Sequence, residues 1–201
     1  MPCLDEAPRL LIVPGLGDSP PGHWQSWLQA GVRGSVRVVQ RDWQAPDLDR
    51  WAGRVAATLE RTDHRGPWLV AAHSFGVLAV LRHLVLARVT DAERIAGLLL
   101  VAPADPDKFG VGEWLPQQAL PVPTTVVLST NDPWLGLAAG QRWARRWGAS
   151  VQNLGPAGHV NIESGFGPWP ASRRWLLAQE QRLARLRRPQ HAAWQAWSFA
   201  V

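Results

Sequence analysis

A serine in the middle of the chain has the surroundings of a catalytic nucleophile. Ser74 lies in Ala72-His73-Ser74-Phe75-Gly76, between an apolar run at 68–71 and a helix-like run at 77–81. A strand, a sharp turn and a helix with serine at the turn form a nucleophile elbow, which lifts the hydroxyl above the sheet. The strand and helix pack together there, so small residues are needed two positions to either side of the serine. Ala72 and Gly76 are small, and the stretch therefore predicts a nucleophile, although an ordinary strand-to-helix loop is the alternative interpretation.

Candidates for a base and an acid follow two later strands. Asp132 comes after the β-branched run 124–129, and His159 ends the glycine-rich loop that follows a short run at 150–154. A serine hydroxyl is a poor nucleophile until a base takes its proton, and an acid must orient that base. In α/β-hydrolases the chain order is serine, acid, histidine, and open α/β sheets carry their sites at the carboxyl ends of strands. The order of these residues along the chain and their positions after predicted strands together predict a triad of Ser74, Asp132 and His159.

The sequence contains alternatives to this acid and this histidine. Asp105, after the predicted strand 95–101, is the alternative acid, and an aspartate before a proline, as at 132, is also a common turn residue. Asp132 is preferred because its strand immediately precedes the strand that leads to His159. Only His159 follows the last predicted strand. His73 is next to the serine in the turn, so its side chain is expected to point elsewhere, and His83 lies within the following helix. The remaining histidines are expected to be surface or capping residues that pack or face solvent: His23, His64 and His191.

Backbone N–H groups are expected to stabilise the oxyanion of a tetrahedral intermediate. One should be that of Phe75, next to the nucleophile, and the other should come from the loop after the first strand. That loop is 14–19, where Leu16 is the first choice and Gly17 the second, and a plain tight turn is the alternative. Most of the 13 tryptophans are expected to pack in the core. Trp114 is the best candidate for lining a substrate pocket, together with Gly17.

Apolar runs alternate with helical patterns along the chain. Strands are expected at 9–13, 35–40, 68–72, 95–101, 124–129 and 150–154, and helices at 23–30, 47–60, from the serine turn to about 88, 135–147 and 172–187. This alternation predicts a three-layer α/β fold with a mainly parallel sheet of about six strands.

The spacing of these elements also predicts the domain organisation. The connection between the fourth and fifth strands leaves room for a small flap at 109–118 and for no separate cap domain. Residues 1–188 are expected to form a single α/β-hydrolase domain, and residues 189–201 a C-terminal tail.

The amino-acid composition limits the classes of partner and the cellular location that are expected for this chain. The net charge of +5 comes mostly from scattered arginines, with a cluster at 173–188 that is interpreted as a solvated helix face. The sequence carries none of the common nucleic-acid-binding motifs, so no nucleic acid is expected as a partner. No apolar run approaches the roughly 20 residues that span a bilayer, and the N-terminus does not resemble a secretory signal. The single cysteine, Cys3, suits a reducing compartment, and a cytoplasmic location is expected.

Several motifs together resemble those of retinoblastoma-binding protein nine and the YdeN-like serine hydrolases. They are Pro14-Gly15-Leu16-Gly17, His23-Trp24-Gln25-x-Trp27, Ala72-His73-Ser74-Phe75-Gly76, Asn131-Asp132-Pro133 and the run GHVNIESGFGPWP at 158–170, which is the most specific. The resemblance covers roughly residues 9–185. It implies a compact α/β-hydrolase without a cap, in which Ser74, Asp132 and His159 form the triad. Ala72 stands where the usual pattern has glycine.

These observations predict a serine hydrolase that acts on a small-molecule acyl substrate, with short esters as the specific expectation. Neither a metal nor an organic cofactor is expected. An amidase or aminopeptidase that uses the same triad is one alternative. The other is a module that keeps the fold and binds a protein, which the name of the resembled family suggests and which a complete triad disfavours.

Overall fold

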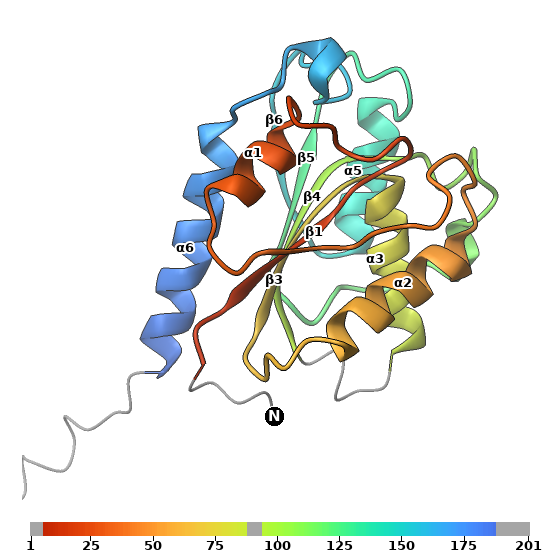
Figure 1. Cartoon of the computed structure of the whole chain (residues 1–201). Helices are drawn as coiled ribbons and strands as arrows, with labels where there is room; N and C mark the ends of the chain where they lie inside the picture. The colour runs from red at the N-terminus through yellow and green to blue at the C-terminus, as the bar shows by residue number, and fades with distance from the viewer. Residues whose placement is uncertain (1–5, 88–93, 188–201) are drawn as a thin grey trace, which may run out of the picture.

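Six parallel strands form one sheet at the centre of the molecule (Figure 1). The computed structural model describes residues 6–87 and 94–187. The strands are β1 (Arg9–Val13), β2 (Val36–Arg37), β3 (Trp68–Ser74), β4 (Ile95–Pro103), β5 (Thr124–Leu128) and β6 (Ser150–Asn153), in the order β2-β1-β3-β4-β5-β6. The predicted mainly parallel sheet of about six strands is confirmed.

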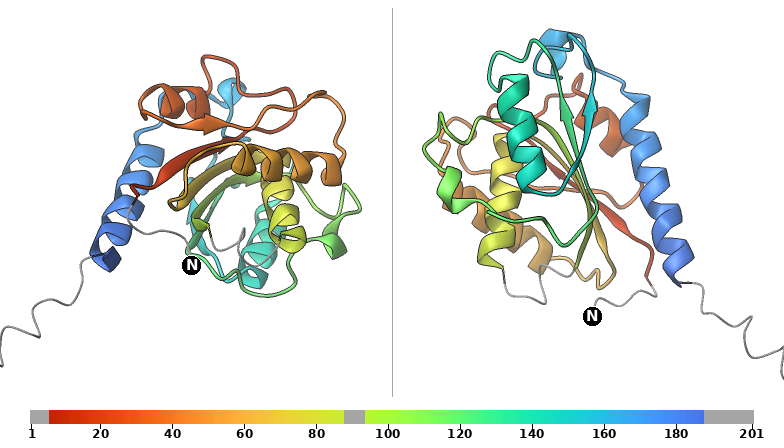
Figure 2. Two further views of the ribbon diagram at one scale, coloured as in Figure 1. Left: turned by 60° about the horizontal axis from the view of Figure 1, so that its bottom comes forward. Right: turned by 180° about the vertical axis from the view of Figure 1, so that it is seen from behind.

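Helices cover both faces of this sheet (Figures 1 and 2). They are α1 (Trp24–Ala30), α2 (Leu48–Glu60), α3 (Phe75–Leu86), α5 (Leu137–Arg146) and α6 (Pro170–Arg187), with short 3-10 turns η1 (Gly112–Trp114) and η2 (Ile162–Ser164). α1 and α6 pack on one face, and α2, α3 and α5 pack on the other. Because both faces are covered, the central strands are apolar without alternation, as in β3, where Val70 and Ala71 are both fully buried.

From β1 the chain continues to β2 on one side and later returns to β3 on the other side, so the direction of strand addition reverses between β1 and β3. This reversal determines where the site is expected. In open α/β sheets the crevice at such a reversal receives the ligand. The loop after β1 and the serine at the end of β3 are therefore neighbours. Gln25 of α1 holds the two strands at this point, because its buried side-chain amide donates to the carbonyl oxygens of Val13 at 3.1 Å and Ala71 at 2.9 Å.

The elements lie close to their predicted positions, with small differences at the ends. β2 has two residues instead of the six expected at 35–40, and β3 continues through Ser74 instead of ending at Ala72. α6 begins at Pro170 instead of 172, since proline suits the first position of a helix. Asp47 caps α2 as predicted, and its carboxylate accepts the Arg50 N–H.

The connection from β4 to β5 contains only the turn η1, so residues 6–87 and 94–187 include no cap domain over the site. The single domain over 1–188 stays a prediction. The expected tail at 189–201 and Cys3 lie outside the described residues. No helix within 6–87 and 94–187 has the length and apolar character that crossing a membrane requires.

The close packing of α3 against the end of β1 can be tested at Gly76. A Cβ at this position would lie 2.3 Å from the carbonyl oxygen of Pro14 and 2.5 Å from that of Val13. We expect Gly76→Ala to lower the free energy of unfolding in urea by about 3 kcal/mol, because two backbone segments must separate. The control is Gly53→Ala, at an exposed position of α2 with nothing near the added methyl, which should raise it by about 0.5–1 kcal/mol. A Gly76→Ala protein as stable as the wild type would contradict this packing.

Candidate active site

Ser74 occupies a strained turn between β3 and α3. Its backbone has φ 52° and ψ −125°, a left-handed conformation that residues other than glycine rarely adopt. The loop after β1 presses against it, since a Cβ on Gly15 would lie 2.6 Å from the Cβ of Ser74. Small residues are therefore required around the serine, as the sequence indicated, and the fully buried Ala72 fits where glycine is usual.

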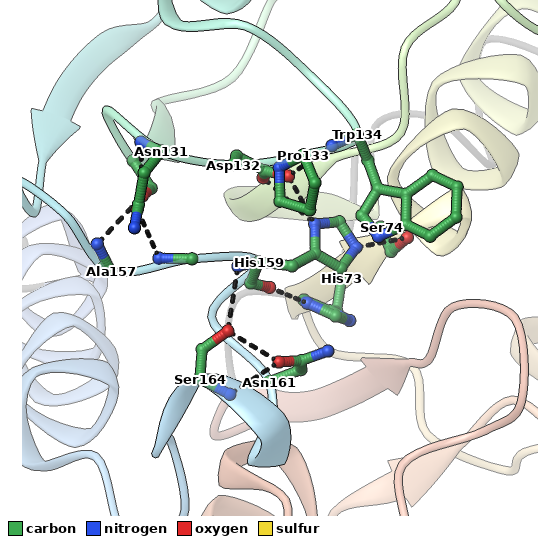
Figure 3. A network of polar contacts seen from close by, with 12 residues as sticks. His73, Ser74, Asn131, Asp132, Pro133, Trp134, Ala157, His159, Asn161 and Ser164 are labelled. Carbon is green, nitrogen blue, oxygen red and sulfur yellow. Dashed lines mark hydrogen bonds and ion pairs between the residues drawn. The ribbon is translucent and has the colours of Figure 1, made fainter.

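The structure brings Ser74, His159 and Asp132 into one chain of hydrogen bonds (Figure 3). His159 Nε2 lies 2.9 Å from Ser74 Oγ, and His159 Nδ1 lies 3.0 Å from each carboxylate oxygen of Asp132. A carboxylate only accepts, so Nδ1 carries the proton and the Nε2 of a neutral ring is free to accept the serine proton. The side chain of Asp132 is 3% exposed and that of His159 is 9% exposed, so water competes little for these bonds.

Hydrogen bonds tie the loop that carries Asp132 to the loop that carries His159. Asn131 Oδ1 accepts the N–H of Gly158 at 2.7 Å, and the Ser129 hydroxyl accepts the N–H of Ala157 at 3.0 Å. The Thr130 N–H donates to the carbonyl of Gly155. Because β5 and β6 are adjacent, these short links fix the carboxylate relative to the imidazole.

The backbone around His159 is held at each polar group. Its N–H donates to Ser164 Oγ at 3.1 Å, and its carbonyl oxygen lies 2.9 Å from His73 Nε2 (Figure 3). Gly158 and Val160 on either side have positive φ angles of 56° and 50°, and Val160 is fully buried. A β-branched residue is costly in this conformation. The loop is therefore forced into a shape that points the imidazole at Ser74.

Residues 10–178 match the model of a family described as serine hydrolase. The chain belongs to this serine hydrolase family. The crystal structure of a YdeN-like hydrolase from Pectobacterium atrosepticum is 35% identical, with a TM-score of 0.81 over 90% of this chain and 94% of that chain. These findings confirm the resemblance to the YdeN-like hydrolases, and they show that the protein is an α/β-hydrolase enzyme.

More distant structures share the fold of the hydrolase. The ydeN gene product of B. subtilis is 21% identical, with a TM-score of 0.68 over 85% of this chain and 97% of that chain. Est1E from Butyrivibrio proteoclasticus is 14% identical, with a TM-score of 0.63 over 89% of this chain and 92% of that chain. No curated protein matches the chain.

A cavity of about 170 Å³ opens beside the serine of the hydrolase, and we call it the active-site cavity. Its walls come from the loop after β1, the ends of β3 and α1, and the turn η2. The lining residues are Leu16, Asp18, Pro20, His23, His73, Ser74, His159, Asn161, Ile162 and Glu163. The cavity is smaller than most ligand sites, which occupy about 300–1,000 Å³.

The structure distinguishes the two candidates for the second oxyanion donor in this hydrolase. The N–H of Gly17 donates to the Trp43 carbonyl at 3.1 Å and is therefore occupied. Leu16 lines the active-site cavity, and Phe75 is the first residue of α3, where N–H groups have no partner within the helix. Phe75 and Leu16 remain the predicted pair of donors.

Two of the sequence expectations for the pocket do not fit the structure. Trp114 does not line the active-site cavity. It lies under Arg82 of α3, whose guanidinium is 5.6 Å from the centre of the indole ring. Gly17 is absent from the lining as well. Trp134, by contrast, lies beside the triad residues, where it is 58% exposed and has its ring 6.2 Å from that of His159 (Figure 3).

The position of Trp134 follows from its own place in the chain, two residues after Asp132. Its backbone N–H donates to Asp132 Oδ1 at 2.9 Å, and this bond holds Trp134 in the loop that carries Asp132.

Asp105, the alternative acid, has a different role, because its carboxylate accepts the N–H of Asp107 within a turn. Within residues 6–87 and 94–187, no three His, Cys, Asp or Glu side chains gather as a metal site would require.

Two histidines that were expected to lie away from the site are part of it. His23 caps α1, which was one of its two expected roles. It is only 3% exposed, however, and it lines the active-site cavity. His73 is 5% exposed and packs between the rings of His23 and His159, each 4.9 Å away between centres. His73 directly precedes Ser74 in β3, so the strand that carries the serine to the edge of the sheet also carries His73 there. This adjacency was the signal in the sequence that could have placed His73 at the site.

Burial keeps both of these histidines neutral. Desolvation, followed by the neighbouring Arg37, lowers the pKa of His23 from 6.5 to about 4. Desolvation, followed by the nearby His159 and His23, lowers the pKa of His73 well below its ordinary value. The hydrolase therefore carries two uncharged imidazoles close to the ring of His159.

These lowered pKa values predict that the hydrolase loses stability in mild acid. Between pH 6.5 and about 4 the unfolded chain binds protons at His23 and His73 that the native protein does not bind, so the free energy of unfolding falls as the pH is lowered. For His23 alone the difference corresponds to about 3 kcal/mol at most. We expect His23→Asn, which retains a capping side chain, to flatten this dependence in urea unfolding from pH 7.5 to 4.5. An identical pH dependence in the variant and the wild type would show that His23 is not held neutral.

Proposed function

We propose that this serine hydrolase cleaves small esters through an acyl-enzyme intermediate on Ser74. The observation that carries the proposal is the continuous chain of hydrogen bonds from Ser74 Oγ through both nitrogens of His159 to Asp132. Each bond has the direction that proton transfer from serine to histidine requires.

The reaction begins when Ser74 Oγ attacks the ester carbonyl and His159 Nε2 takes the hydroxyl proton. Asp132 stabilises the imidazolium that results. The carbonyl oxygen becomes negative and is held by the N–H groups of Phe75 and Leu16. His159 then gives its proton to the departing alkoxide, which leaves as the alcohol. A water molecule, deprotonated by the same ring, attacks the acyl-serine and releases the acid. None of these steps requires a metal or an organic cofactor.

The size and openness of the site favour a small-molecule substrate with a short acyl group. The active-site cavity has a volume of about 170 Å³, and no cap domain covers it among the described residues. Amides could enter the same site, and a comparison of esters with amides of equal acyl length separates an esterase from an amidase or aminopeptidase. A cytoplasmic location, suggested by the single cysteine, belongs to this proposal.

Replacing the nucleophile tests the proposal directly. We expect Ser74→Ala to abolish hydrolysis of 4-nitrophenyl acetate and butyrate and to abolish labelling by a fluorophosphonate probe, because no other group supplies the attacking oxygen. Ser150→Ala, in the edge strand β6, is the control and should be labelled like the wild type. Equal labelling of Ser74→Ala would reject Ser74 as the nucleophile. A wild-type protein that is neither labelled nor active would favour the protein-binding module instead.

The two candidate acids give a matched pair of variants. Asp132→Asn should lower kcat by about 10³–10⁴-fold, because a carboxamide neither holds the required tautomer of His159 nor stabilises the imidazolium. Asp105→Asn keeps an oxygen that can accept the Asp107 N–H, and kcat should change by no more than about twofold. Steady-state kinetics on one short ester measures both. A larger loss in Asp105→Asn than in Asp132→Asn would reverse the assignment of the acid.

A further inference from the structure

The mechanism does not use the two neutral histidines that line the active-site cavity. His23 comes from the N-terminal end of α1 and His73 from the end of β3, and their rings meet edge to face at 4.9 Å between centres. Both line the cavity that Ser74 lines, so a substrate bound at the serine lies next to them. A buried polar group at a binding site must find a partner in the ligand, or binding loses free energy.

The bond to α1 fixes which nitrogen of His23 carries the proton. His23 Nδ1 accepts the backbone N–H of Gln25 at 3.2 Å, so Nδ1 is unprotonated. A neutral imidazole has one proton, which must then reside on Nε2. His23 therefore offers a hydrogen-bond donor at the far corner of its ring, and no bond among the described residues uses that atom.

The opposite arrangement holds for His73. Its Nε2 lies 2.9 Å from the carbonyl oxygen of His159, and a carbonyl can only accept, so Nε2 carries the proton. The Nδ1 of this neutral ring is left as an acceptor, and no bond among the described residues uses it. The two adjacent rings therefore present one donor and one acceptor.

The charged groups nearby do not favour an anionic ligand. Asp18 lines the cavity and is paired at 2.7 Å with Arg37, whose guanidinium also donates to the Ser26 hydroxyl and the Ser19 carbonyl. Glu163 lies exposed at the mouth. An anion would meet the carboxylate of Glu163, the neutralised pair of Asp18 and Arg37, and two uncharged rings. A neutral group that both accepts and donates a hydrogen bond matches the pair best.

We propose that His23 and His73 form a donor–acceptor pair that selects esters carrying a neutral hydroxyl or carboxamide group near the scissile carbonyl. The group accepts from His23 Nε2–H and donates to His73 Nδ1. The inference rests on the proposed function, since it names the substrate class of the same site. An apolar group in this place leaves both ring nitrogens unpaired, which lowers kcat/KM by roughly 10–100-fold.

Pairs of esters in which a hydroxyl replaces a methyl group test the proposal. The acyl side is tested with 4-nitrophenyl 3-hydroxybutyrate against 4-nitrophenyl 3-methylbutyrate. The alcohol side is tested with 3-hydroxypropyl butyrate against butyl butyrate. We expect kcat/KM of the wild type to favour the hydroxyl ester by about tenfold or more in at least one pair. The 4-nitrophenyl ester of 3-aminobutyrate tests for a cation, and a preference for it over the hydroxyl ester would overturn the assignment of a neutral group.

Variants can remove one free nitrogen while keeping the structural bond of the same side chain. In His23→Asn the amide oxygen replaces Nδ1 as the cap of α1, and the distal donor is lost. In His73→Gln the amide nitrogen replaces Nε2 as the donor to the His159 carbonyl, and the acceptor is lost. Each should bring the ratio of kcat/KM for the two esters towards one. His23→Gln is the matched control, because it loses the cap but keeps a distal N–H, and it should retain the preference.

The ratio is the decisive readout, since a general loss of activity lowers both rates together. Equal kcat/KM for the hydroxyl and methyl esters in both pairs would overturn the inference. So would a preference that survives intact in both His23→Asn and His73→Gln. In either case Ser74-dependent hydrolysis would leave the proposed function standing. Failure of the wild type to hydrolyse any of the esters would overturn the proposed function, and this inference with it.

Discussion

The conformation of Ser74 is the constraint on which the rest of the site depends. A serine at φ 52° and ψ −125° costs conformational free energy, and it persists because the segments around it leave no other arrangement. Gly15 approaches from the loop after β1, and Gly76 lets α3 start against the carbonyl of Pro14. The same contacts that strain the serine bring Leu16 to the cavity wall. Ser74 and the expected oxyanion donor are therefore positioned by one packing interaction between β1 and β3.

The base and the acid are placed by a different means, namely direct bonds between two loops. The backbone of His159 has the support of Ser164 on its N–H and of His73 on its carbonyl, and Asn131 holds Gly158 next to it. A loop with this many bonds has little freedom to turn the imidazole away. A preorganised base avoids the cost of ordering it during the reaction, which is a large part of what an enzyme contributes.

The sequence predicted those features that depend on chain topology. The succession of six strands, the order of serine, acid and histidine, and the cap at Asp47 all follow from local patterns, and the structure has them. The pocket could not be predicted in the same way, because the direction of a side chain depends on packing between distant segments. Trp114 was preferred on its place in a loop, yet Arg82 from α3 holds it elsewhere. His23 was expected to be a surface or capping residue, and only the packing of α1 on the sheet shows that it also lines the active-site cavity.

The neutrality of His73 has a consequence for the reaction itself. In the proposed reaction His159 becomes an imidazolium, and the centre of the His73 ring lies 4.9 Å from the centre of the His159 ring. Two positive charges at this distance repel by about 3 kcal/mol at an effective dielectric constant of about 20. Burial, which lowers the pKa of His73, removes this repulsion while leaving its N–H to hold the carbonyl of His159. A lysine or arginine could make the same bond, but either would oppose the charge that the base must acquire. An uncharged donor beneath the base therefore supports the geometry of the triad without raising the free energy of its cationic state.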